Sequence, residues 1–193
     1  MTLPIFELRI SEDENSERGV NAVALVDKPA IGEGFFAFDK QERFAVVSED
    51  ERIVVGPAMI PNMLIYRQDP DGSEYNVTFS AETIQAIAEK FFAKNFQKNG
   101  NEMHDETKPV DLVFFQSWIA DENKGIPKMK QFEHLPDGTW FLGAKVKSDN
   151  TWADVKNGTF KGFSVEGYFE MKPLKMRTEE STLNLIKTLL KDY

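Results

Sequence analysis

One serine in this chain of 193 residues lies in a pattern that could support nucleophilic chemistry. Residues 160–170 alternate in character, so Ser164 and Glu166 share one face of an expected β-strand whose other face is apolar. Gly162 and Gly167 interrupt this strand, and such glycines often mark a bulge or the close approach of a backbone or a ligand. Ser164 is therefore a candidate nucleophile, although a strand serine with no activating partner is more often an ordinary solvent-facing residue.

A serine hydroxyl needs a base to take its proton, and histidine is the usual choice near neutral pH. The chain contains two histidines. His104 lies in a polar segment between an expected helix and an expected strand, a typical position for a functional group on a scaffold. His134 adjoins a Pro-Asp-Gly turn, where an exposed histidine needs no special explanation. The sequence therefore favours His104 over His134 as the base.

A carboxylate that orients the imidazole would complete the group. Glu166 is nearest in sequence to Ser164 and shares its face of the strand, so a histidine could lie between them. Asp111 begins the strand that follows His104 and is the rival. Asp105 adjoins His104 directly, and such a neighbour usually points elsewhere. The pattern alone leaves this choice open.

Composition narrows the class of protein. A length of 193 residues suits one domain with appendages, and 41% hydrophobic residues with 16 phenylalanines indicate a globular core. The net charge of -9 argues against a nucleic-acid binder. The absence of cysteine excludes disulfides, thiol nucleophiles and thiolate metal sites, and two histidines argue against a histidine-rich zinc site. We expect no cofactor and no metal.

The sequence also bears on localisation. Residues 1–5 lack a basic region followed by an apolar core, so no signal peptide is visible. The longest uncharged run, 53–66, is too short to span a bilayer and contains glycine and proline. We therefore expect a soluble, intracellular protein without a membrane partner.

Hydrophobic periodicity predicts the elements that would position these residues. A helix is expected after Ser80 as N-cap, with an apolar stripe from Ile84 to Phe92 and an end at Gly100. A shorter helix around Trp152 would be capped by Asp149 or Asn150 and ended by the Asn-Gly pair at 157–158, and residues 183–190 show a third helical pattern. Strands are expected over 5–10, 20–26, 44–47, 53–61 (broken by Gly-Pro, as at an edge or bend), its continuation 64–67, 74–79, 110–120, 128–135, 139–146 and 160–170, and residues 32–38 form a further short apolar segment.

Several of these stretches resemble one protein family. Met103-His-Asp, Gln116-Ser-Trp-Ile119, Gly138-Thr-Trp140 and residues 155–169 are similar to the tailed-phage prohead, or capsid maturation, serine proteases. The similarity is closest to a defective-prophage branch, whose N-terminal segment resembles residues 23–31 and 35–38. It covers about residues 20–172, and its most specific part is the run Lys-Gly-Phe-Ser-Val-Glu-Gly-Tyr-Phe at 161–169.

The resemblance implies an α+β fold, an antiparallel β-barrel like that of herpesvirus assemblin, flanked by a few helices. It implies peptide-bond hydrolysis by a Ser–His pair with a variable third residue. Carried over by position, Ser164 is the nucleophile and His104 the general base and then acid. In the herpesvirus relatives the third residue is a histidine on a later strand, and no histidine follows Ser164 here. That leaves either a carboxylate or a Ser–His dyad without a third residue, and Glu166 is placed first as the third catalytic residue.

The resemblance also implies an organisation and a setting. Residues 1–45 would pack on the barrel, 46–172 would form it, and 173–193 would be a linker and an amphipathic helix for docking. The protein would act in the host cytoplasm, inside the assembling procapsid, on scaffold and major capsid proteins and on itself, with a second copy as a further candidate partner. The alternatives are an inactive structural procapsid component and an unrelated acidic β-rich binding module, which would have Ser164 facing solvent without a nearby histidine.

Overall fold

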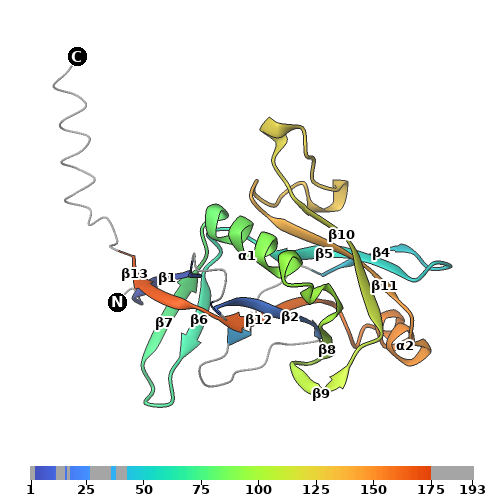
Figure 1. Ribbon diagram of the computed structural model, residues 1–193, viewed down its shortest axis with the longest axis horizontal. Helices are drawn as coiled ribbons and strands as arrows, with labels where there is room; N and C mark the ends of the chain where they lie inside the picture. The colour runs from blue at the N-terminus through green and yellow to red at the C-terminus, as the bar shows by residue number, and fades with distance from the viewer. Residues whose placement is uncertain (1–2, 12–15, 17, 27–35, 38–42, 175–193) are drawn as a thin grey trace.

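The fold is described here from a computed structural model, which describes residues 3–11, 16, 18–26, 36–37 and 43–174 (Figure 1). Within these residues strands dominate and two α-helices accompany them, which confirms the expected α+β class. The strands form three sheets, with the orders β13-β1-β7-β6, β10-β11-β5-β4 and β3-β12-β2-β8-β9. Among the described strands no sheet closes on itself, so the expected barrel is not confirmed.

The strands have the following bounds: β1 Ile5–Arg9, β2 Gly19–Val26, β3 Phe36–Ala37, β4 Ala45–Ser48, β5 Ile53–Met59, β6 Ile65–Gln68, β7 Glu74–Thr78, β8 Gly100–Glu102, β9 Asp105–Pro109, β10 Leu112–Ile119, β11 Trp140–Val146, β12 Gly162–Tyr168 and β13 Glu170–Pro173. The helices are α1 Ala81–Ala93 and α2 Asp149–Asn157, with short 3₁₀ helices η1 Phe96–Lys98, η2 Glu122–Lys124 and η3 Lys130–Phe132.

The sheet that contains the serine strand has one face in the main core. β12 lies between β3 and β2, and β2 in turn runs parallel to β8. Phe163 and Val165 of β12, with Val23 and Leu25 of β2, are fully buried in this core. Helix α1 lies over β2 (Figure 1) and adds Phe91 to the same cluster. The opposite face of β12 is therefore the one that carries Ser164 and Glu166.

Helix α1 follows the sequence pattern closely at its start. The Ser80 hydroxyl accepts a hydrogen bond from the Thr83 backbone N–H at 3.2 Å, as an N-cap does. Ile84, Ile87 and Phe91 have no exposed surface, because they lie on one side of the helix against the sheet. Burial of each such side chain stabilises the fold by about 1.5–3 kcal/mol.

The helix ends differ from expectation in two places. α1 ends at Ala93 rather than at Gly100, because Asn95 takes a left-handed conformation with φ of 60° before η1 begins. The cap of α2 is Ser148, not Asp149 or Asn150, because the Ser148 hydroxyl accepts from the Thr151 N–H at 3.3 Å. Its end at Gly158, with φ of +79°, is as predicted.

The predicted break at Gly56-Pro57 is wrong, because β5 continues through it and lies between β11 and β4. The strand tolerates proline because β4 stops opposite Val55, so Pro57 needs no N–H to bond on that side. Strand β6 is not a continuation of β5 but belongs to another sheet. The chain turns between them at Asn62, where φ is 59°.

Residues 128–135 do not form the predicted strand. They contain η3 instead, and Phe132 and Leu135 from this segment pack against Phe141 in a second, smaller core. The apolar spacing that suggested a strand therefore reflects the packing of an irregular segment. Strand β13, which pairs with β1, was not expected from the sequence.

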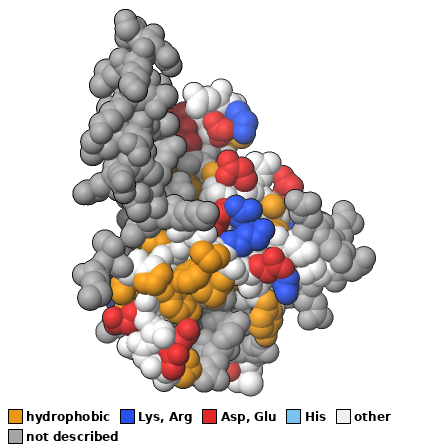
Figure 2. All heavy atoms as spheres, turned by 90° about the vertical axis from the view of Figure 1, so that its left-hand side faces the viewer, with side chains coloured by type: hydrophobic (Ala, Val, Ile, Leu, Met, Phe, Trp, Pro, Cys, Tyr) orange, Lys and Arg blue, Asp and Glu red, His pale blue; other side chains and the backbone are white. Residues whose placement is uncertain are grey.

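One side of the molecule is apolar at its surface. Figure 2 shows hydrophobic side chains gathered on the side where β1, β6, β7 and β13 lie. Leu64, Tyr66, Met171 and Leu174 are exposed on or next to these strands. This apolar surface belongs to a different sheet from that of Ser164.

Some expectations fall on parts of the chain that the structure does not describe. Of the short apolar segment 32–38, only Phe36 and Ala37 are described, as β3. The helix expected over 183–190 lies outside the described residues. The division at residues 45 and 172 stays a prediction. In the described part of the chain, no helix has the length and apolar character needed to cross a membrane.

Candidate active site

Strand β12 places Ser164 and Glu166 on one face of their sheet. In the pairing with β2, Ser164 lies opposite Ala24 and Glu166 lies opposite Ala22. Both Ser164 and Glu166 have a relative exposure of 0%. The reading of Ser164 as an ordinary solvent-facing strand residue is therefore wrong.

His104 reaches this face from a tight turn. β8 ends at Glu102 and β9 begins at Asp105, so Met103 and His104 form a two-residue connection, with φ of 52° and 61°. Positive φ at both central residues matches the primed turns of β-hairpins, but residues other than glycine adopt it rarely. The Met103 N–H donates to the Leu25 carbonyl at 3.0 Å, which holds the turn against β2. Such unusual backbone is often concentrated at functional sites.

The His104 imidazole contacts the Glu166 carboxylate. Nδ1 of His104 lies 2.8 Å from Oε1 of Glu166, and the two side chains are 4% and 1% exposed. The two atoms are at hydrogen-bond distance, but the angle of the contact is not that of a hydrogen bond. His104 Nε2 and Glu166 Oε2 have no hydrogen-bond partner among the described residues. Buried polar atoms in folded proteins are nearly always bonded, so each exception needs an explanation such as an ordered water or a catalytic role. The imidazole is thus held at its Nδ1 side.

The rival carboxylates lie elsewhere. The Asp111 side chain is 66% exposed and lies 3.9 Å from the Lys147 ammonium. Asp105 accepts hydrogen bonds from Thr107, and these bonds hold the pKa of Asp105 below its usual range. The contacts of Asp111 with Lys147 and of Asp105 with Thr107 therefore lead away from the imidazole. Of the three carboxylates considered, the structure brings Glu166 to His104.

His134 has the exposed position that its turn predicted. Among the described residues, no group of three or more His, Asp or Glu side chains could hold a metal ion.

Asn101 joins this face of the sheet and was missed by sequence reasoning. The pairing of β2 with β8 places Asn101 beside Ala24, so Ser164, Ala24 and Asn101 form one row across three strands. Asn101 is 4% exposed, and its Oδ1 has no partner among the described residues. A polar segment without alternating apolar residues gave no sign of β8, so the sequence could not show this row. Ala24 is small and lies between Ser164 and Asn101 in this row.

Gly167 is required next to Glu166. A Cβ atom at Gly167 would lie 2.0 Å from the Gly19 carbonyl oxygen, so the two backbones approach closely here. The pairing of β12 with β2 is irregular at this point, because Asn21 has no opposite residue. The expected meaning of this glycine, a bulge with close backbone approach, is confirmed.

The fold and the site define a class of protein. A serine, a histidine and a glutamate on one buried sheet face, with the histidine against the glutamate, are the groups that serine hydrolases use. A family model described as "Putative phage serine protease XkdF" matches residues 42–172, and this range contains all three side chains. The chain therefore belongs to this family of phage serine proteases. A search of curated proteins and a search of solved structures returned no match.

Proposed function

We propose that the protein is an active serine endopeptidase of phage capsid maturation. The observation that carries this proposal is the buried contact of 2.8 Å between His104 Nδ1 and Glu166 Oε1, on the strand face that also carries Ser164. Membership of a phage serine protease family supports it.

In the proposed reaction, Ser164 Oγ attacks the carbonyl carbon of the scissile peptide bond while His104 Nε2 takes the hydroxyl proton. The Glu166 side chain beside Nδ1 fixes the tautomer of the imidazole and stabilises the imidazolium. The imidazolium then gives its proton to the leaving amine, and an ester between Ser164 and the substrate remains. His104 next takes a proton from water, whose oxygen attacks the ester, and Ser164 recovers its proton.

The proposed setting goes beyond the family match and extends it to phage assembly. The enzyme would work in the host cytoplasm, inside the assembling procapsid, where it cuts scaffold and major capsid proteins and itself. The proposal retains the kinship with herpesvirus assemblin. It requires no cofactor, because serine, histidine and carboxylate groups suffice for this hydrolysis.

A second candidate function has an observation in its favour. Ser164 has no exposed surface, and a hydroxyl without access to solvent cannot reach a peptide carbonyl unless the site opens. A chain that never opens the site would be a structural procapsid component with the fold of a protease and no activity.

Co-expression separates the two functions. The wild type, Ser164→Ala and the control Ser73→Ala, which changes a serine in an exposed turn, are each produced with the scaffold and capsid proteins of the same phage and analysed by intact mass. We expect defined fragments with the wild type and with Ser73→Ala, and none with Ser164→Ala. Identical masses in all three samples would favour the structural role.

A further inference from the structure

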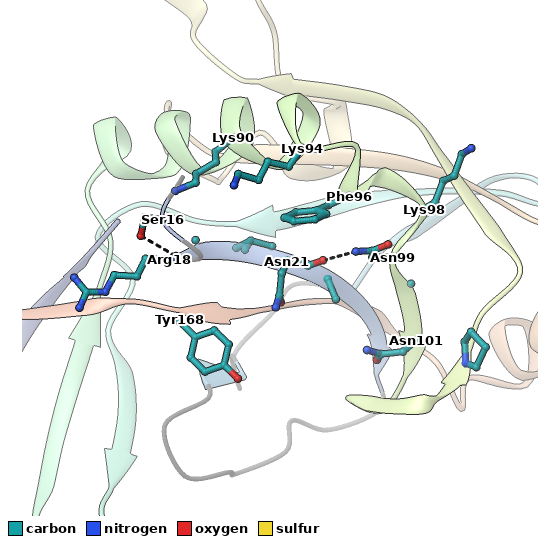
Figure 3. Close-up of a pocket in the computed structure, with 15 residues that line it drawn as sticks. Ser16, Arg18, Asn21, Lys90, Lys94, Phe96, Lys98, Asn99, Asn101 and Tyr168 are labelled. Carbon is teal, nitrogen blue, oxygen red and sulfur yellow. Dashed lines mark hydrogen bonds between the residues drawn. The ribbon is translucent and has the colours of Figure 1, made fainter. Parts of the chain in front are cut away.

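A basic pocket of about 650 Å³ is shown in Figure 3, and Asn101, which lies in the row of Ser164, is one of its lining residues. It lies where the end of α1 and η1 face the first half of β2. We define the basic pocket by its four cationic lining residues, which are Arg18, Lys90, Lys94 and Lys98. No Asp or Glu occurs among the described residues that line it, although the whole chain has a net charge of -9.

The lysines of α1 concentrate this charge. Lys90 and Lys94 are four residues apart, so they lie on the same side of the helix, where like charges repel. Both line one wall of the pocket in Figure 3. Arg18 forms an ion pair with Glu170, whereas Lys94 and Lys98 form none with a described residue. A bound anionic group would supply ion-pair partners for Lys94 and Lys98.

The pocket shares lining residues with the sheet face that carries Ser164, although Ser164, His104 and Glu166 do not themselves line it. Ala22, which lies opposite Glu166, and Asn101, which lies in the row of Ser164, both line the pocket. A group bound in the pocket would therefore lie within a strand or two of the proposed nucleophile, since neighbouring strands are about 4.8 Å apart.

The pocket also offers groups that bind a polypeptide backbone. β8 pairs with β2 only from Val23 onward, so residues 19–22 of β2 have no partner strand on this edge among the described strands, although the Asn21 carbonyl accepts a hydrogen bond from the Asn99 side chain at 3.0 Å. Asn21 and Asn101 each contribute a buried side-chain oxygen without a partner among the described residues. Open strand edges bind extended peptides through main-chain hydrogen bonds.

Building on the proposed protease function, we propose that the basic pocket binds an acidic stretch of the substrate polypeptide beside the scissile bond. The extended substrate lies along residues 19–22 of β2, and its Asp and Glu side chains face Lys90 and Lys94. The enzyme thereby selects cleavage sites flanked by acidic residues.

A polypeptide fits the pocket better than a nucleic acid does. The pocket adjoins an open strand edge and the row of Ser164, where a peptide chain is to be cut. The net charge of -9 repels a long polyanion, whereas a short acidic segment experiences mainly the nearby lysines.

The test measures binding without cleavage. Fluorescence anisotropy at low salt measures how tightly the full-length Ser164→Ala protein binds the fluorescein-labelled octapeptides (Glu-Ala)₄ and (Gln-Ala)₄. We expect (Glu-Ala)₄ to bind at least about tenfold more tightly, and added salt to weaken its binding. Adding Lys94→Glu should remove most of this preference. The control Lys156→Glu makes the same charge change on the exposed end of α2, away from the pocket. It should leave the preference for (Glu-Ala)₄ intact.

Three results would overturn the inference: equal binding of the two peptides, equal effects of Lys94→Glu and Lys156→Glu, or tighter binding of an eight-nucleotide oligothymidine at the same site. Because the Ser164→Ala protein cannot cleave, the binding result stands even if the protease function fails. Conversely, cleavage by the wild type with no preference for acidic flanks would refute the pocket assignment and leave the protease assignment in place.

Discussion

His104 Nδ1 lies 2.8 Å from Glu166 Oε1, and this contact joins the β8–β9 turn to β12 in a nearly solvent-free site. Glu166→Gln keeps the shape of the side chain but removes its charge and permits the wrong imidazole tautomer. We expect the proteolytic rate to fall by about 10²–10⁴-fold. The rates at which purified wild type and purified Glu166→Gln cleave separately purified scaffold or capsid protein measure this loss.

The control for Glu166→Gln is Asp111→Asn, which neutralises the exposed rival carboxylate. It should leave the rate within about twofold of the wild type. A large loss in Asp111→Asn together with a small loss in Glu166→Gln would reverse the assignment of the third residue.

The Met103–His104 turn holds Met103 at a φ of 52°. Glycine adopts positive φ without a steric cost, so Met103→Gly should leave the free energy of unfolding unchanged or raise it by up to about 1 kcal/mol. Thr107→Gly, in the extended strand β9, should lower it instead. Urea unfolding of the two variants checks the sign. A marked loss of stability in Met103→Gly would show that the turn does not have this conformation.

Gly167 should tolerate no side chain, because a Cβ would lie 2.0 Å from the Gly19 carbonyl oxygen. Since backbone must move to admit it, we expect Gly167→Ala to lower the free energy of unfolding by about 2 kcal/mol or more. Gly158→Ala meets open space but has φ of +79°, so its loss should be nearer 1 kcal/mol. Thermal unfolding compares them, and the reverse order would refute the close approach of β12 and β2.

Deletion of residues 174–193 tests the docking role expected for this part of the chain. We expect the shortened protein to retain cleavage of soluble substrate and to enter procapsids less than the full chain does. Quantitative immunoblotting of purified procapsids measures the second effect. Unchanged incorporation would count against a docking role.

Sequence periodicity correctly predicted those helices and strands whose formation depends on the pattern of their own residues. The alternation of β12 and the capped stripe of α1 are local patterns, so both were correct in kind. The prediction of a break at Gly56-Pro57 was wrong. Whether a strand tolerates proline depends on where the neighbouring strand, here β4, ends, and no local pattern shows this. The prediction of a strand over 128–135 was wrong because the apolar side chains of this segment fill a second core although its backbone is irregular.

For the candidate site too, some features could be predicted from the sequence and others depend on the fold. Residue types and the shared face of Ser164 and Glu166 could be read from the sequence, but the choice between Glu166 and Asp111 could not, because it depends on where the β8–β9 turn lies. Asn101 and the basic pocket arise from strand register and from the packing of α1 against β2, which join residues far apart in the sequence.

The most direct test of the central claim is the reaction of the protein with diisopropyl fluorophosphate, followed by intact mass and peptide mapping. A serine activated by His104 displaces fluoride and retains the phosphoryl group. We predict one adduct, on Ser164, in the wild type and in Ser73→Ala, and none in Ser164→Ala or His104→Ala. A wild type that acquires no adduct while co-expressed substrates stay intact would contradict the account.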